Sequence, residues 1–281
     1  MTTATNDAPL WSNTDQLDAV FMSLAEGNES AIPALVDALG DAPSRPLRSW
    51  PPAIAEVWQT GLELSLDGLA NSGVPRAEEL LMRVCLTGFD TMVLRDELAN
   101  LARRQFSDYL DPAGLLGAFG IHDRTVPPSV IHARWSFFEA LKPGVVCFDP
   151  AHGMGRVEQI DDLANHVRFR FARTLSLPLD LVLRQTVLVR PDSLVQRLAA
   201  DGAGAIGILA EGAFMEEAAA SLVSVAPLDA SSIKSLLVPG LLSLEHFGEL
   251  TEGVVGPVAV ERSKAQASTR TWDSARSLDE M

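Results

Sequence analysis

The stretch that decides the fold is residues 141–192, LKPGVVCFDPAHGMGRVEQIDDLANHVRFRFARTLSLPLDLVLRQTVLVRPD. It is the only long segment in which apolar residues recur at every second position. Val167, Phe169 and Phe171 alternate with Arg168 and Arg170. Successive side chains of an extended strand point to opposite faces, so this run predicts a strand with one apolar and one basic face.

Further short strands are predicted on both sides of this run. Residues 145–148 (VVCF) predict a short buried strand, residues 156–160 (RVEQI) predict another, and leucines alternate at 177, 179 and 181. The polar segment 161–165 has the composition of a turn between the second and third strands. Strands this short have too little surface for an open sandwich. We therefore expect them to close into a small barrel, which also hides the strand edges.

Two glycines, Gly153 and Gly155, lie where the first strand turns into the second. Glycine tolerates the positive φ of a tight turn, and Pro150 stiffens the approach. A phosphate-binding loop is the alternative reading of these glycines. A dinucleotide fingerprint would need a third glycine at position 158, which is Glu, and a following helix where a strand is predicted. The tight turn is therefore favoured.

Residues 142–144 (KPG), 149–157 (DPAHGMGRV) and 160–161 (ID) resemble the Tudor/SH3-like barrel of bacterial transcription proteins. Such a barrel occurs in the RNA-polymerase-binding module of CarD-like regulators and transcription-repair coupling factors, and at the C-terminus of UvrD-type helicases. The flanks resemble the N-terminal region of long Gre-type transcription elongation factors, where a helical array precedes the barrel. An aromatic residue that is common in such barrels is absent at Ala151 and His152.

The patterns and the resemblance together predict an α+β fold that is mostly α: a helical array, a small SH3/Tudor-like β-barrel and a short C-terminal helical segment. The expected organisation is a disordered tail (1–12), the array (13–140), the barrel (141–192), the helical segment (193–252) and a flexible tail (253–281). Trp272 in that tail resembles a tryptophan-bearing helix of long Gre proteins, with a lone aromatic in a mobile tail as the alternative.

The array is expected to contain seven helices joined by short loops, because capping residues, prolines and glycines punctuate apolar stripes of helical period. The expected helix starts are Asn13 and Thr14, Ser30, Asp90 or Thr91, and Asp111. No sequence motif repeats at a fixed period, so no named repeat family is indicated. Trp58 and Trp135 are expected in the core.

The chain has 47% apolar and 21% charged residues and a net charge of −15. This balance disfavours bulk binding of nucleic acid, which needs clustered Lys and Arg. The charge is uneven: residues 145–190 hold six arginines and five acids, which makes them +1 and leaves −16 for the remainder. No apolar run approaches the roughly 20 residues that span a bilayer, and no secretory signal is visible. A cytoplasmic protein is expected.

No sequence motif of a known catalytic site is present. The resemblance implies a non-enzymatic protein without cofactor that docks on RNA polymerase, a Gre-like elongation factor without the transcript-cleavage domain. The predicted contact residues are His152, Gly153, Met154, Arg156, Arg168 and Arg170. Two alternatives stay open. One is a hydrolase or metal enzyme with a site near His122, Asp149 and His152 between barrel and helices. The other is an architectural helical interaction protein.

Overall fold

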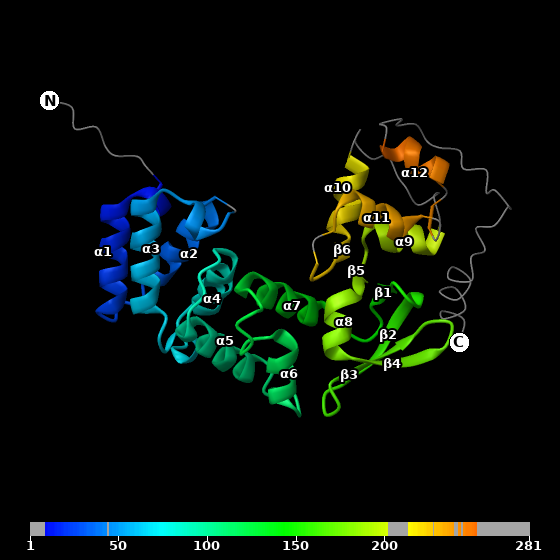
Figure 1. The fold of residues 1–281 in the computed structure, drawn as a ribbon, viewed down its shortest axis with the longest axis horizontal. Coiled ribbons are helices and arrows are strands. Elements are labelled where there is room, and N and C mark those ends of the chain that lie inside the picture. The colour runs from blue at the N-terminus through cyan, green and yellow to red at the C-terminus, as the bar shows by residue number, and fades with distance from the viewer. Residues whose placement is uncertain are drawn as a thin grey trace. The chain divides into compact units, whose positions relative to one another are not determined.

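A computed structural model describes residues 9–43, 45–201, 213–226, 228–238, 241, 242 and 244–251. The chain divides into two compact units, Met1–His132 and Ala133–Met281 (Figure 1). The expected tails and Trp272 lie outside the described residues, apart from residues 9–12. No helix among the described residues is both long enough and apolar enough to cross a membrane.

The first unit is the predicted helical array, which is confirmed. Its helices, the last of which crosses into the second unit, are α1 (Thr14–Ala25), α2 (Ala31–Asp41), α3 (Pro52–Ser65), α4 (Ala77–Leu86), α5 (Met92–Gln105), α6 (Pro112–Phe119) and α7 (Pro128–Ala140), with 3-10 turns η1 (Leu10–Ser12), η2 (Leu47–Ser49) and η3 (Leu69–Asn71). The side chains of Asn13, Thr91 and Asp111 accept hydrogen bonds from main-chain N–H groups of the first turns of α1, α5 and α6, so these caps are confirmed. Ser30 precedes α2, but its side chain does not cap the helix, because its hydroxyl donates to Oδ1 of Asn28 instead.

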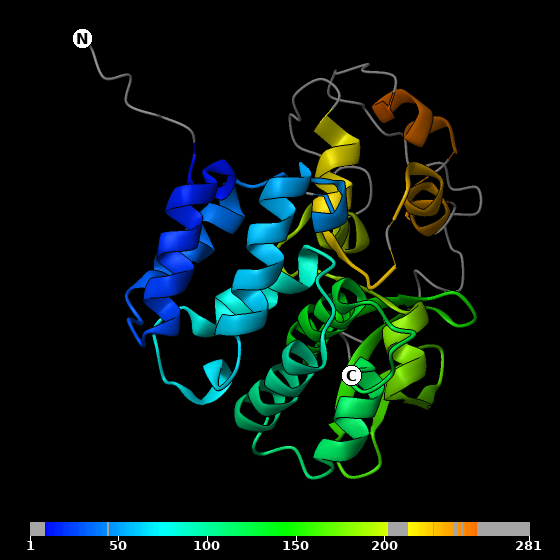
Figure 2. The same ribbon diagram turned by 60° about the vertical axis from the view of Figure 1, so that its left-hand side comes forward.

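Aromatic side chains form the core of this array. Trp58 is fully buried, and its indole Nε1–H donates to the carbonyl oxygen of Trp11 at 3.0 Å. Trp50 packs edge-on against both. Helices α1 and α3 lie side by side (Figures 1 and 2). The helix approach is close because Gly61 has no side chain: a Cβ atom there would lie 2.2 Å from the ring of Phe21. Burial of Trp58 was predicted, and that of Trp135 is also confirmed.

The second unit is built on a six-stranded antiparallel sheet of order β4-β3-β2-β1-β5-β6. The strands are β1 (Val146–Asp149), β2 (Gly153–Asp161), β3 (His166–Arg170), β4 (Thr174–Pro178), β5 (Val187–Val189) and β6 (Leu222–Val223). The predicted alternation on β3 is confirmed, because Val167 and Phe169 are buried and Arg168 is exposed. The turn predicted at 161–165 also joins β2 to β3.

Three sequence predictions about the strands need correction. The order of strands leaves β4 and β6 at the two edges, so the described strands do not close into the expected barrel. The reason is that β5 pairs with β1 on one side and with β6 on the other. The alternating leucine run is also not one strand, because Leu179 begins helix α8 (Leu179–Gln185) directly after Pro178. Gly155 lies inside β2, opposite Cys147, rather than in the turn.

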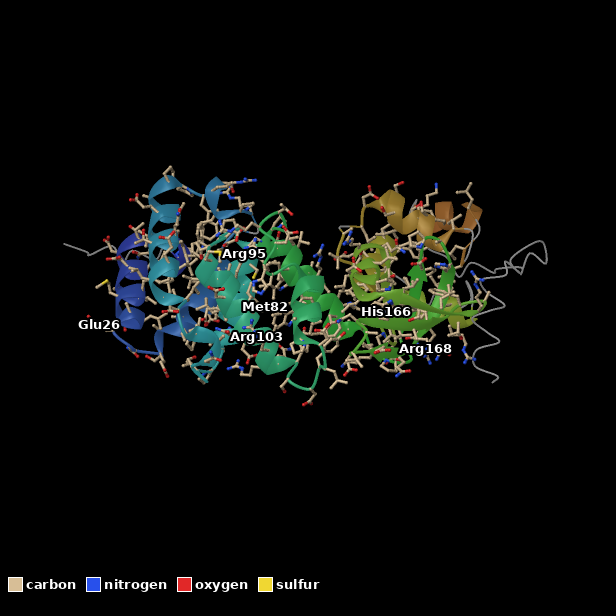
Figure 3. All side chains as sticks on the ribbon, turned by 60° about the horizontal axis from the view of Figure 1, so that its bottom comes forward. Glu26, Met82, Arg95, Arg103, His166 and Arg168 are labelled. Carbon is tan, nitrogen blue, oxygen red and sulfur yellow. The ribbon has the colours of Figure 1, made fainter. Side chains whose placement is uncertain are left out.

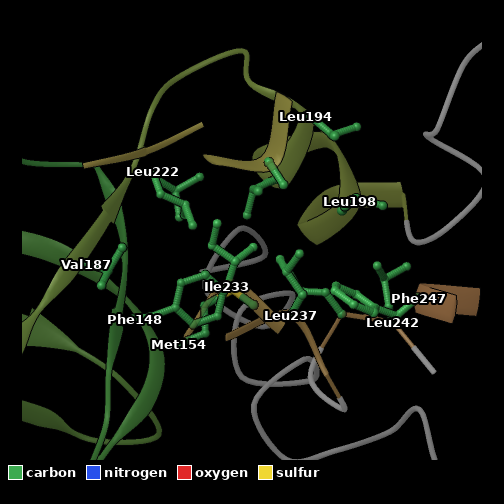
Figure 4. Packing of buried hydrophobic residues seen from close by; sticks show 14 of the residues in the cluster. Phe148, Met154, Val187, Leu194, Leu198, Leu222, Ile233, Leu237, Leu242 and Phe247 are labelled. Carbon is green, nitrogen blue, oxygen red and sulfur yellow. The ribbon is translucent and has the colours of Figure 1, made fainter. Parts of the chain in front are cut away.

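The sheet and the C-terminal helices share one hydrophobic cluster (Figure 4). The helices are α9 (Leu194–Asp201), α10 (Ala213–Ala220), α11 (Ala230–Leu237) and α12 (Leu244–Thr251). Phe148 and Val187 of the sheet pack in this cluster together with Leu198, Leu237 and Phe247 of the helices. Removal of this apolar surface from water stabilises the whole unit, so residues 141–192 and 193–251 do not have separate cores.

Candidate docking surface on the sheet

The candidate site is the polar face of strands β2, β3 and β4. Arg168 of β3 is exposed there, between Gln159 of β2 and Ser176 of β4 (Figure 3). Arg170, two residues along the same strand, stands opposite Arg156. We call Arg156, Arg168 and Arg170 the arginine face. Their common side follows from the two-residue period of the strands.

A β-bulge organises this face. The register of β2 against β3 shifts between Val157 and Gln159, which leaves Glu158 without a residue directly opposite. The Oε1 atom of Glu158 accepts a hydrogen bond from Nε of Arg170 at 2.6 Å. Two arginines directly opposite each other repel, and this carboxylate offsets part of the repulsion between Arg156 and Arg170. Arg168 is exposed and forms no such ion pair within the described part of the chain.

Strand β4 is an open edge of the sheet among the described strands. The N–H of Leu179 donates to the carbonyl oxygen of Asn165 at 2.8 Å. Main-chain groups of an antiparallel strand point alternately to its two neighbours. The residues of β4 that face β3 are therefore 175 and 177, and the N–H groups of Thr174 and Ser176 point away from the sheet. Pro178 fits this pattern, because its missing N–H falls on the open side.

The turn between β1 and β2 is held by the carboxylate of Asp149, whose side chain is 0% exposed. Its Oδ1 atom accepts from the main-chain N–H groups of Ala151 and His152 and from Nδ1 of His152 at 2.7 Å. Its Oδ2 atom accepts from Nε2 of Gln185 at 3.0 Å. With Nδ1 donating to Asp149, neutral His152 carries its free lone pair on Nε2. The carboxylate positions the imidazole.

Aromatic rings pack over Gly155, close to the same turn. The ring of His152 stacks on Phe171 with 5.3 Å between centroids, and Phe171 stacks on Phe169. A Cβ atom at Gly155 would lie 2.3 Å from the Phe171 ring and 2.8 Å from the carbonyl oxygen of Arg170. Glycine is therefore needed at position 155 for close packing, while Gly153 adopts the predicted positive φ of 78°.

Both cysteines are buried free thiols. Burial raises the pKa of Cys147, and the nearby charge of Asp149 raises it further. Burial also raises the pKa of Cys85 to about 12. Neither thiol is therefore available as a thiolate nucleophile at neutral pH.

The predicted contact residues occupy three different environments. Arg168 is exposed, and Arg156, Arg170 and His152 are partly exposed. Gly153 is the first residue of β2. The side chain of Met154 is 2% exposed and belongs to the hydrophobic cluster, so it cannot form part of an exposed contact surface. Sequence reasoning did not find Glu158, Phe171 or Gln185. Gln185 reaches Asp149 across 36 residues, a separation at which no local pattern exists.

The residues of the alternative metal or hydrolase site are divided between the units. Asp149 and His152 are in contact, whereas His122 is an exposed residue of the other unit. Within the described parts of the chain, no group of three or more His, Cys, Asp and Glu side chains could hold a metal ion.

The helical unit has a cavity of about 310 Å³ lined by Asp90, Thr91, Met92, Arg95 and Arg124. Arg95 is only 2% exposed, and its guanidinium donates to both carboxylate oxygens of Asp90. It also donates to the carbonyl oxygens of Ile121, Asp123 and Val126 at 2.8–3.0 Å. All of these donors are used by the protein itself, so Arg95 fastens the loop between α6 and α7.

Comparison of this chain with protein-family models, with curated proteins and with solved structures found no match.

Proposed function

We propose that this protein is a non-enzymatic, transcription-associated factor that docks on bacterial RNA polymerase through strands β2, β3 and β4. The observation that carries the proposal is the open edge of β4, whose outward main-chain groups at Thr174 and Ser176 lie beside the exposed Arg168. Such an edge accepts an added strand from a partner by main-chain hydrogen bonds. The resemblance of residues 142–161 to polymerase-binding Tudor modules supplies the identity of the partner.

The arginine face gives this edge a preference for acidic partners. Residues 145–190 are +1 in a chain of net charge −15, and arginine pairs with carboxylates through a planar fork of donors. No aromatic residue stands beside Arg168 in its cross-strand row, which contains Gln159 and Ser176. Binding of single-stranded nucleic acid usually adds aromatic stacking platforms to a basic surface. An acidic protein segment therefore suits this face better than nucleic acid does.

Binding to immobilised core RNA polymerase tests the proposal. The double substitution Arg168→Glu/Arg170→Glu is expected to weaken binding by about tenfold or more, most strongly at low salt. Arg184→Glu/Arg190→Glu is the matched control, because it reverses the same amount of charge at two exposed arginines elsewhere in the unit. Equal affinity of the Arg168/Arg170 variant and the wild type, or no binding by the wild type, would contradict the proposal.

A second substitution tests the strand edge itself. Ser176→Pro removes an N–H that points away from the sheet, so the fold is expected to tolerate it while strand addition is blocked. Binding is expected to fall in Ser176→Pro with no change in the circular dichroism spectrum. Retained affinity in the folded Ser176→Pro variant would exclude strand addition at β4.

The hydrolase or metal-enzyme alternative draws on the Asp149–His152 pair alone. A buried carboxylate that orients a histidine is an arrangement used in general base catalysis. Here all the donors around Asp149 come from the turn and Gln185, and they account for the turn structure. Metal in the purified protein that disappears in His152→Ala would favour this alternative over docking.

A further inference from the structure

The tip of the β2–β3 hairpin carries an exposed leucine. Leu163 is 69% exposed, the highest value among the large hydrophobic side chains of the described residues. The tips of turns ordinarily contain Gly, Asn, Asp, Ser or Pro, because the backbones of these residues adopt turn conformations readily and most of their side chains are polar. Leu163 buries little of its side chain within its own unit, so the side chain is available to a partner at the turn.

Hydrogen bonds order the backbone of the turn around Leu163. The N–H of Ala164 donates to Oδ1 of Asp161 at 2.9 Å, and Nδ1 of His166 donates to the carbonyl oxygen of Ala164 at 2.6 Å. Asn165 adopts a left-handed φ of 52°, and its carbonyl oxygen accepts from the N–H of Leu179. A turn whose backbone is already ordered loses little backbone entropy when a partner covers it, which favours binding.

The β2–β3 tip is acidic, whereas the far end of strand β3, where it turns into β4, is basic. Asp161 and Asp162 precede Leu163, and neither forms an ion pair with a side chain in the described part of the chain. Arg170 and Arg173 lie at the other end, beside Thr174. The tip adjoins the open edge, because His166 stands opposite Pro178 of β4. A partner strand on β4 would therefore meet arginines at one end and an acidic, leucine-bearing tip at the other.

We infer that Leu163 is an anchor residue that inserts into an apolar pocket rimmed by Lys or Arg side chains on the protein that binds the β4 edge. This inference rests on the proposed docking function and adds the second point of contact. Two contacts of opposite charge at the two ends of one edge fix the direction and register of the bound strand. Leu163 supplies apolar burial, and Asp161 and Asp162 supply charge complementarity to the rim of the pocket.

The test measures affinity for immobilised core RNA polymerase. Burial of a leucine side chain is worth enough that Leu163→Ala is expected to weaken binding by about tenfold or more. Leu163→Met keeps an apolar side chain of similar volume and is expected to bind within about threefold of the wild type. Leu110→Ala is the matched control, because Leu110 is 65% exposed and belongs to the helical unit. Its affinity is expected to be unchanged.

The outcomes separate this inference from the proposed function. If Ser176→Pro loses binding while Leu163→Ala binds like the wild type, the anchor inference is overturned and docking at the β4 edge stands. If the wild type does not bind core RNA polymerase, the proposed function fails, and the inference fails with it. An equal loss in Leu163→Ala and Leu110→Ala would also overturn the anchor. Unchanged thermal unfolding in each variant shows that the exposed substitutions leave the fold intact.

Discussion

The Nδ1 atom of His152 lies 2.7 Å from the Oδ1 atom of Asp149, a carboxylate that is entirely buried. The pair joins the β1–β2 turn to helix α8, because Gln185 donates to the other oxygen of Asp149. The carboxylate thus orders both the turn that precedes β2 and the imidazole proposed for partner contact.

Asp149→Ala is expected to lower the free energy of unfolding of the second unit by about 3 kcal/mol, since it leaves several partly buried donors without their acceptor. Urea unfolding and hydrogen exchange at residues 150–153 measure the change. Asp180→Ala removes only a surface pair with Arg184 and is expected to cost less than about 1 kcal/mol. Similar values for the two variants would show that the buried network does not stabilise the turn.

Gly155→Ala is expected to destabilise the sheet by about 3 kcal/mol, because the added Cβ atom collides with the Phe171 ring and with a main-chain carbonyl. Gly117→Ala is the control. Its Cβ atom would meet nothing within 4 Å, and it lies within helix α6, where alanine stabilises by about 0.5–1 kcal/mol. Thermal unfolding compares them. A Gly155→Ala variant as stable as the wild type would rule out the close packing of Phe171.

Arg95→Lys is expected to lower the free energy of unfolding of the helical unit by about 3 kcal/mol or more. A lysine cannot reproduce the fork that binds both oxygens of Asp90 while also donating to the loop carbonyls. Hydrogen exchange is expected to accelerate at residues 120–126, and the change in Trp58 environment reports unfolding by fluorescence. Arg103→Lys is the control, because the exposed Arg103 side chain donates to Oδ1 of Asn100 on the surface of α5. It is expected to change stability by less than about 0.5 kcal/mol.

The ion pairs of Glu79 predict that the stability of the helical unit falls at acidic pH. Hydrogen bonds from Arg76 and then from Arg83 lower the pKa of Glu79 from its ordinary value of 4.5 to about 2. Because the folded-state pKa lies below the unfolded-state pKa, this carboxylate stabilises the fold above pH 4.5, and the contribution is lost as the pH falls towards 2. The loss of stability over this range is expected to be smaller in Glu79→Gln than in the wild type.

Urea unfolding between pH 2.5 and 6 measures this difference. The Glu79 side chain is 40% exposed, so high salt is expected to shrink the effect by screening. Glu56→Gln, at an exposed position of α3, serves as the control and is expected to follow the wild-type pH profile. If Glu79→Gln also follows that profile, the ion pairs with Arg76 and Arg83 do not contribute to stability.

Local patterns in the sequence determined much of this protein. The helix starts at Asn13, Thr91 and Asp111 follow from side chains that cap the next turn of chain, an interaction within three residues. The alternation around Arg168 determined which side of β3 is buried, because the side-chain period of a strand is two.

Only the tertiary structure decided which segments pair and what each polar group contacts. The strands do not close into a barrel because β6 pairs with the outer side of β5. β6 follows β5 by more than 30 residues, so no local pattern indicates this pairing. Met154 was predicted at the surface and is buried, since the register of β2 directs it into the cluster shared with the C-terminal helices. The partners of Asp149 and Arg95 lie as many as 36 and 31 residues away. Contacts over such separations depend on the packing and strand register of the whole unit. Periodicity and capping are local patterns and carry no information about them.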